Sequence, residues 1–182
     1  MWINDIEKLE YNGTGKVAEN SVQDIFLGLG FAEANIDTAS KGWKNKTCYF
    51  NDLFIGEVEM AENSFYSQPL GSQKSPDFIL NTGGETYFIE VKASKTRSGF
   101  QFNTHLVRDK FTYVLSDPTI GFKVVSGSEI MAPEVREILA ECHKEQRFTM
   151  DRYNKKIQAL ECNTQGWSYY ARPMFSQKRL FA

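Results

Sequence analysis

The sequence predicts a layered α/β or α+β domain, in which helices cover the faces of a central sheet. Two observations lead to this fold class. Two pairs of β-branched and aromatic runs, each joined by a short turn-forming stretch, occupy the middle of the chain. Segments with apolar residues at helical spacing precede and follow them. A chain of 182 residues has the length of one ordinary domain, so we expect a single domain over residues 1–182.

The first expected helix covers residues 15–31. Its apolar residues recur at helical spacing: Val22, Ile25, Phe26 and Leu29. Gly30 then provides a C-terminal cap. Residues 46–60 have mixed strand character. Residues 61–75 are polar and contain Pro69 and Gly71, so we expect a loop there.

The next two runs, residues 77–81 and 86–94, flank a Gly-Gly pair. Strand-forming residues on both sides of such a pair are typical of an antiparallel hairpin. Alternation along the second strand sends Glu90 and Lys92 to one face, together with Phe88, and Val91 to the other.

A second strand pair is expected at residues 111–117 and 121–130. Residues 132–147, with a proline near the first turn, predict a helix. Residues 151–162 predict another helix. The tail, residues 166–177, is aromatic and is interrupted by a proline.

Composition narrows the class of protein. The three cysteines, Cys48, Cys142 and Cys162, are odd in number and far apart, which indicates reduced thiols in a cytoplasmic protein without a zinc site. No apolar run is long enough for a membrane span. The net charge of −2 does not indicate a polyanionic partner. Basic residues nevertheless concentrate between Lys92 and Lys110 and after residue 163, where they could follow phosphates or form ordinary solvated faces.

The end of the predicted hairpin combines two acids with a lysine. Asp77 lies at the start of the first strand, so antiparallel pairing brings it close to Glu90 and Lys92 near the end of the second. Carboxylate oxygens with several retained waters suit Mg²⁺, which can polarise a phosphodiester and activate a water. A neighbouring lysine can orient that water. The alternative is an exposed Glu–Lys pair on an edge strand.

This set resembles the PD-(D/E)XK nuclease superfamily, the fold of most type II restriction endonucleases. The resemblance rests on Pro76 and Asp77 and on the "EVK" stretch of Glu90, Val91 and Lys92. It implies a mixed central sheet flanked by helices, with Asp77 and Glu90 binding Mg²⁺, the Val91 carbonyl as a further ligand, and Lys92 positioning the attacking water.

The resemblance also implies a further carboxylate from the helix before the hairpin, and Glu19 is the candidate. Glu19 lies on the same face as the apolar stripe of the first expected helix. An acid on an inward face needs a partner or a cation. Equally, an acid in the first turn of a helix is stabilised by the helix dipole. Both interpretations of Glu19 remain open on the sequence.

The residues after the hairpin suit DNA. Lys95 and Arg97 could hold phosphates, and a following polar group could contact base edges. That group consists of Gln101, Asn103, Thr104 and His105. The aromatic and basic tail adds Arg172 and Gln177, although its aromatic residues could equally fill the core or a dimer contact. For the segment after the hairpin, the alternative is a polar loop between strands.

The leading interpretation is therefore a type II restriction endonuclease. It would cleave double-stranded DNA at a short sequence as a homodimer, with one active site per strand. A repair or junction-resolving nuclease of the same fold is the second interpretation. A DNA-binding module without catalytic activity is the third.

Overall fold

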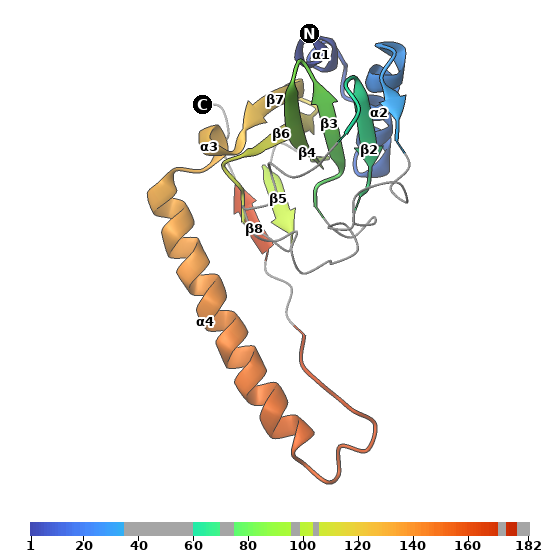
Figure 1. The fold of residues 1–182 in the computed structure, drawn as a ribbon. Helices are drawn as coiled ribbons and strands as arrows, with labels where there is room; N and C mark the ends of the chain where they lie inside the picture. Colours follow the sequence, from blue (N-terminus) through green and yellow to red (C-terminus); the bar gives the residue numbers. More distant parts are fainter. Residues whose placement is uncertain (35–59, 70–74, 96–98, 104–105, 171–173, 178–182) are drawn as a thin grey trace.

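The computed structural model describes residues 1–34, 60–69, 75–95, 99–103, 106–170 and 174–177; for residue 103 and residues 174–177 it describes the backbone only. These residues form a six-stranded mixed sheet flanked by helices, together with a two-stranded sheet and one long helix (Figure 1). The expectation of a layered domain that mixes helices and a sheet is confirmed at this level.

The six-stranded sheet has the strand order β1-β2-β3-β4-β6-β7. Its strands are β1 (Ala32–Glu33), β2 (Ser64–Ser67), β3 (Phe78–Thr82), β4 (Glu85–Ala93), β6 (Phe111–Asp117) and β7 (Gly121–Ser126). The β1–β2 and β4–β6 pairs are parallel, and the other three pairs are antiparallel. The chain between β4 and β6 includes β5 (Phe100–Asn103), which pairs with the C-terminal strand β8 (Met174–Gln177) in the second sheet.

The predicted hairpin is confirmed as β3 and β4. Gly83 and Gly84 form its turn with φ angles of 64° and 75°, a left-handed conformation that glycine adopts without strain. The second predicted pair is confirmed as β6 and β7, except that its last residues form the short helix α3 (Gly127–Ile130).

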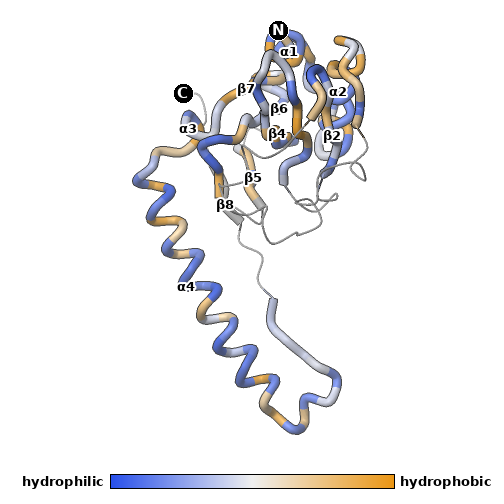
Figure 2. The backbone as a smooth tube through the Cα atoms, in the orientation of Figure 1, coloured by the Kyte–Doolittle hydropathy of each residue, from blue (hydrophilic) through white to orange (hydrophobic). Residues whose placement is uncertain are grey.

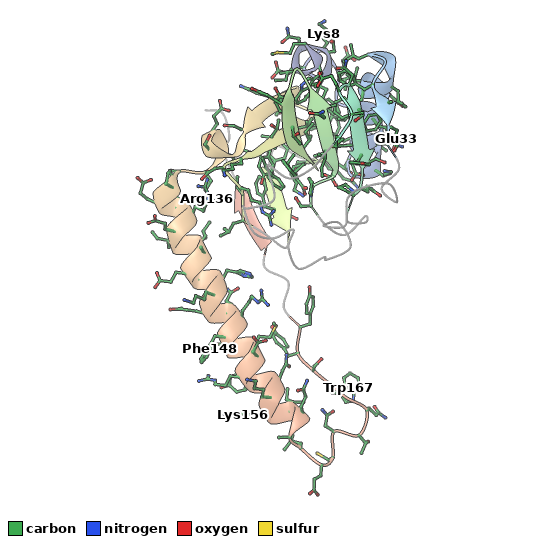
Figure 3. All side chains as sticks on the ribbon, in the orientation of Figure 1. Lys8, Glu33, Arg136, Phe148, Lys156 and Trp167 are labelled. Carbon is green, nitrogen blue, oxygen red and sulfur yellow. The ribbon has the colours of Figure 1, made fainter. Side chains whose placement is uncertain are left out.

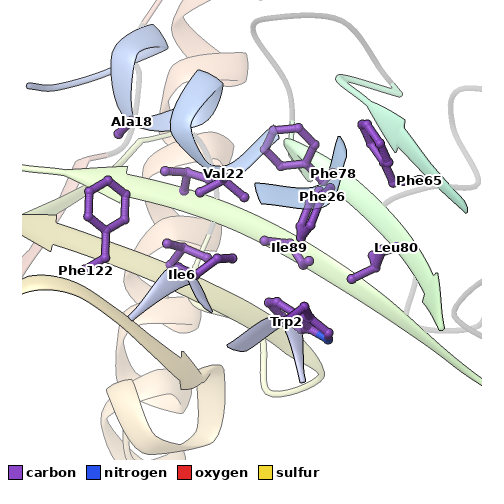
Figure 4. Close-up of a cluster of buried hydrophobic side chains, with 12 residues drawn as sticks. Trp2, Ile6, Ala18, Val22, Phe26, Phe65, Phe78, Leu80, Ile89 and Phe122 are labelled. Atoms are coloured by element: carbon purple, nitrogen blue, oxygen red, sulfur yellow. The ribbon is translucent and has the colours of Figure 1, made fainter. Parts of the chain in front are cut away.

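Two short helices cover one face of the large sheet. They are α1 (Trp2–Ile6) and α2 (Lys16–Gly28), which confirms the helix expected over residues 15–31. Figure 4 shows Trp2 and Ile6 from α1 and Phe26 from α2 packed with Phe78 and Ile89 of the hairpin. On the opposite face, Phe100 and Phe102 of β5 join a second cluster with residues of β4 and β6, such as Phe88 and Tyr113. The central hairpin is therefore buried on both faces.

Two sequence expectations were wrong. Residues 61–75, expected to be a loop, contain β2, because Phe65 and Tyr66 supply buried side chains to opposite faces of the sheet. The helices expected at residues 132–147 and 151–162 are one helix, α4 (Pro133–Gln158), because no glycine or proline interrupts the residues between them. The strand expected within residues 46–60 falls almost entirely outside the described residues.

Helix α4 has 26 residues and projects away from the sheets like an arm (Figure 1). Arg136 anchors its first turns: its Nε donates to the Val107 carbonyl at 3.1 Å, and its guanidinium pairs with Asp109. Residues 159–170 then run back along the arm. There the side-chain amide of Asn154 donates to the Tyr169 carbonyl and accepts from the Tyr169 N–H. None of the helices in the described part of the chain combines the length and apolar character that crossing a bilayer requires.

Candidate active site at the end of the β3–β4 hairpin

The register of the hairpin brings Asp77 and Glu90 to the same level. Phe78 pairs with Ile89, and one step earlier the Asp77 amide donates to the Ile89 carbonyl at 3.0 Å. Continued by one residue, this register sets Asp77 opposite Glu90. The alternation expected along β4 is confirmed, since Ile89 and Val91 belong to the α1/α2 side and Phe88 to the other.

Glu90 is a buried acid whose partner is Lys92. The glutamate is only 4% exposed, and its Oε1 accepts a hydrogen bond of 2.5 Å from Lys92 Nζ. Its second oxygen, Oε2, is buried and has no hydrogen-bond partner among the described residues. Burial of a charged oxygen without a partner costs free energy. The pair is therefore not the exposed edge-strand ion pair that was the alternative for this stretch.

Asp77 is held against β4 by its carboxylate. Its Oδ2 accepts a hydrogen bond of 2.8 Å from the backbone amide of Val91. Burial raises the pKa of Asp77 to about 8, and the nearby charges of Glu90 and Glu19 act in the same direction. The Val91 N–H and the Lys92 ammonium oppose this rise in pKa without cancelling it. Three carboxylates thus interact across the end of the hairpin.

Glu19 reaches this region from the first turn of α2. Its Oε2 accepts a hydrogen bond from Gln68 Nε2 at 2.9 Å and lies 3.3 Å from Lys16 Nζ. Its side chain is 17% exposed, so it is neither in the core nor fully solvated. Both interpretations of Glu19 thus stay open: it is a first-turn acid, and its charge acts on Asp77.

Two contributing residues were not identified from the sequence. The backbone amide of Gln68 donates to the Asp77 carbonyl at 2.6 Å, and its side chain holds Glu19, so this one residue links the two acids. Tyr113 of β6 pairs with Glu90 in the parallel register, and its hydroxyl accepts from the Arg108 amide at 3.0 Å. Nothing local marks Gln68, because it lies in a polar stretch; Tyr113 could have been found only from the strand order.

Among the described residues, no group of three or more His, Cys, Asp or Glu side chains is arranged to hold a metal ion. The donors at the hairpin end are instead two carboxylates, those of Asp77 and Glu90, with the Val91 carbonyl in the same strand and Glu19 nearby. Glu90 Oε2 is buried without a hydrogen-bond partner among the described residues, and burial together with the neighbouring acids raises the pKa of Asp77. A hard cation with oxygen ligands fits that donor set.

The candidate DNA-binding residues are only partly described. Lys95 and Gln101 are exposed. The backbones of Asn103 and Gln177 lie in β5 and β8. The others fall outside the described residues: Arg97, Thr104, His105 and Arg172.

The segment after β4 is not only a polar loop. Phe100 and Phe102 are buried, and Phe100 pairs with Gln177 across the two-stranded sheet. The segment that follows the hairpin and the C-terminal tail, which the sequence presents as separate candidates, are therefore hydrogen-bonded neighbours in β5 and β8 (Figure 1).

Comparison of the chain with protein-family models, with curated proteins and with solved structures finds no match.

Proposed function

We propose that this chain is a divalent-metal-dependent endonuclease that hydrolyses double-stranded DNA at a short sequence, as type II restriction endonucleases of the PD-(D/E)XK superfamily do. One observation carries the proposal. Asp77, Glu90 and Lys92 come together at the end of one buried hairpin, where Lys92 donates to Glu90 and the charges of both residues act on Asp77. A purely structural ion pair would not need the second acid. The six-stranded mixed sheet flanked by helices is compatible with this family.

The cation most consistent with the donor set is Mg²⁺. Asp77 and Glu90 would hold it, with the Val91 carbonyl as a third oxygen and Glu19 close enough to add charge. Bound at this position, Mg²⁺ would polarise a phosphodiester and lower the pKa of a water molecule. The buried Glu90 Oε2, which has no hydrogen-bond partner in the described structure, is the atom that most needs such a positive neighbour.

The remaining groups orient the reactants. The Val91 N–H fixes the rotation of the Asp77 carboxylate through the hydrogen bond to Oδ2. Glu90 Oε1 holds the ammonium of Lys92, whose side chain is 18% exposed and so reaches solvent. In this position Lys92 would orient the attacking water and stabilise negative charge that develops on the phosphate in the transition state.

Binding of DNA would involve β5 and the residues that lead into it. Lys95 leaves the catalytic strand directly, so its ammonium can reach a phosphate near the scissile bond. Gln101, which is exposed between two buried phenylalanines, points away from the core and could contact a base edge. Arg97, Asn103, Thr104 and His105 would extend this surface along the chain. The tail residues Arg172 and Gln177 would add to it beside β5.

Plasmid cleavage in Mg²⁺ and in a chelator tests the proposal. The wild-type protein should cut only with Mg²⁺, and Asp77→Asn and Glu90→Gln should each abolish cutting. Glu85→Gln is the matched control, because Glu85 lies in the same strand at the far, exposed end and its side chain bonds only Tyr87 among the described residues. Sequencing of the fragment ends reports whether cleavage occurs at one sequence.

The outcomes separate the competing functions. Wild-type cleavage by either site variant would overturn the site. Preference for branched over linear duplexes would favour a junction-resolving or repair nuclease. Binding of duplex DNA without cleavage in any divalent metal would favour the DNA-binding module.

A further inference from the structure

The arm helix α4 has an apolar stripe that the described chain does not cover. None of its 26 residues is buried. Val135, Ile138 and Tyr153 are 49%, 67% and 49% exposed, and Leu160, just beyond the helix end, is 55% exposed. The positions within the helix, with the exposed Cys142, follow one line at spacings close to whole helical turns. Figure 2 shows apolar positions spread along the whole hydrophilic arm.

The returning segment lies on a different side of α4. Residues 159–170 are fastened to the helix at Asn154, and the half-buried positions of α4, which include Leu139 and Ile157, fall on that side. Asn154 follows Tyr153 directly, so its side chain is rotated by about 100° from the exposed stripe. The described residues that fold back along the arm therefore leave the stripe uncovered.

The charged side chains along one edge of this stripe change from acidic to basic halfway along the helix. Glu134, Glu141 and Glu145 occupy the first half, and Arg152 and Lys156 occupy the second, at alternating spacings of seven and four residues. All five side chains are exposed. The two cations also border the stripe itself, because they lie over the Tyr153 ring at 5.0 Å and 5.2 Å from its centroid. Lys156 and Phe148 are among the arm side chains drawn in Figure 3.

The charges along this edge are complementary to those of a second copy when the two helices run antiparallel. A two-fold axis perpendicular to both helices places the same edge of each side by side and reverses their direction. The acidic half of one copy then faces the basic half of the other. With the centre between Gln146 and Thr149, Cys142 faces Tyr153 of the second copy. In a parallel pair, by contrast, each edge would meet the opposite edge of its partner, and this complementarity would be lost.

We propose that α4 is a dimerisation arm, and that its exposed stripe pairs with the same stripe of a second copy of this chain in an antiparallel two-helix contact. A helix of 26 residues is about 39 Å long, which spans more than three heptads of paired contact. Nucleic acid is a poorer occupant of this face, because the acidic half would repel phosphates. The proposal rests on α4 alone and does not depend on nuclease activity.

Sedimentation of the full chain over a range of concentrations is the first test. The wild-type protein should sediment as a dimer, and Ile138→Glu should remove the dimer boundary. Ala140→Glu is the matched control, since Ala140 is exposed on the other side of the helix and its substitution should leave the dimer intact. A wild-type monomer at all concentrations, or an equal response of the two variants, would overturn the proposal. A wild-type monomer in which Arg152→Glu/Lys156→Glu weakens duplex binding would assign the arm to DNA.

The charge pattern provides a second test that does not remove apolar contacts. Glu134→Lys/Glu141→Lys/Glu145→Lys makes the edge basic throughout, and Arg152→Glu/Lys156→Glu makes it acidic throughout. Each variant alone should lose the dimer, because like charges face each other. An equimolar mixture should recover a heterodimer. If each variant still forms homodimers, or if the mixture stays monomeric, the complementary edge is not the basis of pairing.

Cross-linking then determines orientation. In a background with Cys48→Ser and Cys162→Ser, a short bis-maleimide should link Tyr153→Cys chains through residues 142 and 153, and peptide mapping should find that pair. The background protein with Cys142 alone should stay uncoupled, because antiparallel pairing separates the two Cys142 side chains along the axis. Efficient coupling of Cys142 to Cys142 would indicate a parallel pair and would contradict the antiparallel contact.

Discussion

Asp77 and Asp117 illustrate, at the scale of single residues, how the surroundings of a candidate functional acid differ from those of a structural one. Asp117 is 8% exposed, but its Oδ1 accepts hydrogen bonds from the amides of Thr119 and Ile120 and closes the β6–β7 turn. The negative charge of Asp117 is therefore stabilised by hydrogen bonds within its own turn. Asp77 receives one amide hydrogen bond and faces the charges of Glu19 and Glu90. Repulsion of this kind persists only where a ligand or a proton relieves it.

The first prediction concerns the pH dependence of stability without metal. The folded-state pKa of Asp77 is about 8 against an ordinary value of 3.8, so the folded protein holds this proton more tightly than the unfolded chain. The stabilisation that the proton provides is complete below pH 3.8 and is lost as the pH rises through about 8. The asparagine of Asp77→Asn carries no titratable proton. The free energy of unfolding of this variant should therefore rise relative to that of the wild type as the pH increases from 3.8 to about 8.

Urea unfolding of both proteins at several pH values in chelator measures this difference. Added Mg²⁺ should narrow it near pH 8, because the cation binds the ionised carboxylate of the wild type. A difference in unfolding free energy that stays constant across the range would contradict the raised pKa of Asp77.

The second prediction separates the structural and chemical roles of Lys92. Lys92→Ala leaves the buried Glu90 carboxylate without its partner, a loss that typically costs about 3–5 kcal/mol. The double variant Lys92→Met/Glu90→Met removes both charges and should recover most of that stability. Neither protein should cleave DNA. Lys92→Ala should still bind duplex DNA with Ca²⁺, which accepts the same oxygen ligands as Mg²⁺.

Denaturant unfolding, plasmid cleavage and a Ca²⁺ binding titration are measured on the same preparations. Restored stability with restored cleavage in the double variant would refute a chemical role for Lys92. Equal loss of binding and cleavage in Lys92→Ala would instead make Lys92 a phosphate contact.

At the scale of elements, the junction between β7 and α3 contains a glycine that lies against the backbone of another segment. A Cβ added to Gly127 would lie 1.8 Å from the Arg108 carbonyl oxygen, a position that cannot be occupied without moving the backbone. The junction is also fixed by a capping box between Ser126 and Glu129. The backbone amide of Ser126 donates to Glu129 Oε2 and lowers the pKa of that carboxyl.

The third prediction uses two glycines of opposite environment. Gly127→Ala should destabilise the protein by about 1–3 kcal/mol or more, because the added methyl group overpacks against backbone. Gly28→Ala, in the last position of α2, meets no atom within 4 Å and should stabilise by about 0.4–1 kcal/mol. Thermal and urea unfolding measure both. Similar small effects of the two substitutions would mean that the backbone at the β7–α3 junction can shift at little cost in free energy.

The elements that sequence patterns predicted correctly are those with strong local signals. The β3–β4 hairpin has a Gly-Gly turn between strand-forming runs, and α2 has an apolar stripe with a terminal glycine. Strand β2 was missed because four residues among polar neighbours show no period, and its pairing with β3 is a tertiary effect. Helix α4 was predicted as two helices, although neither glycine nor proline separates residues 147 and 151.

The candidate site likewise contains residues that local sequence patterns predict and residues that they do not. The proximity of Asp77, Glu90 and Lys92 follows from hairpin register, which the turn and the alternation determine. Gln68 and Tyr113 depend on which strands neighbour the hairpin, and a single sequence does not encode that in any short pattern. The position of Glu19 beside Asp77 likewise depends on how α2 packs across the sheet.

At the scale of the whole molecule, the described residues form a body of sheets and an arm, α4. The chain beyond the arm returns to the body as β8, which pairs with β5. Strand β5 is the strand that follows the candidate catalytic strand. Phe102 of β5 packs edge-on against Tyr113, which is also the β6 neighbour of Glu90. Strand β8 is therefore linked to the hairpin end through its backbone pairing with β5 and the contact of Phe102 with Tyr113.

The last prediction concerns the distribution of stability between the two parts. Strands β4 and β6 are central and buried on both faces, so their amides should exchange with deuterium only through global unfolding. An arm helix with no buried residue resembles an isolated helix, which is marginally stable in water. Its amides should exchange much faster in the monomer. If α4 pairs with a second copy, its protection must rise with protein concentration while that of β4 and β6 stays constant. Hydrogen exchange with peptide mapping at low and high concentration measures both, and Ile138→Glu should abolish the rise. Protection of α4 that is independent of concentration in the wild type, or equally strong in Ile138→Glu, would mean that the arm is stabilised within one chain.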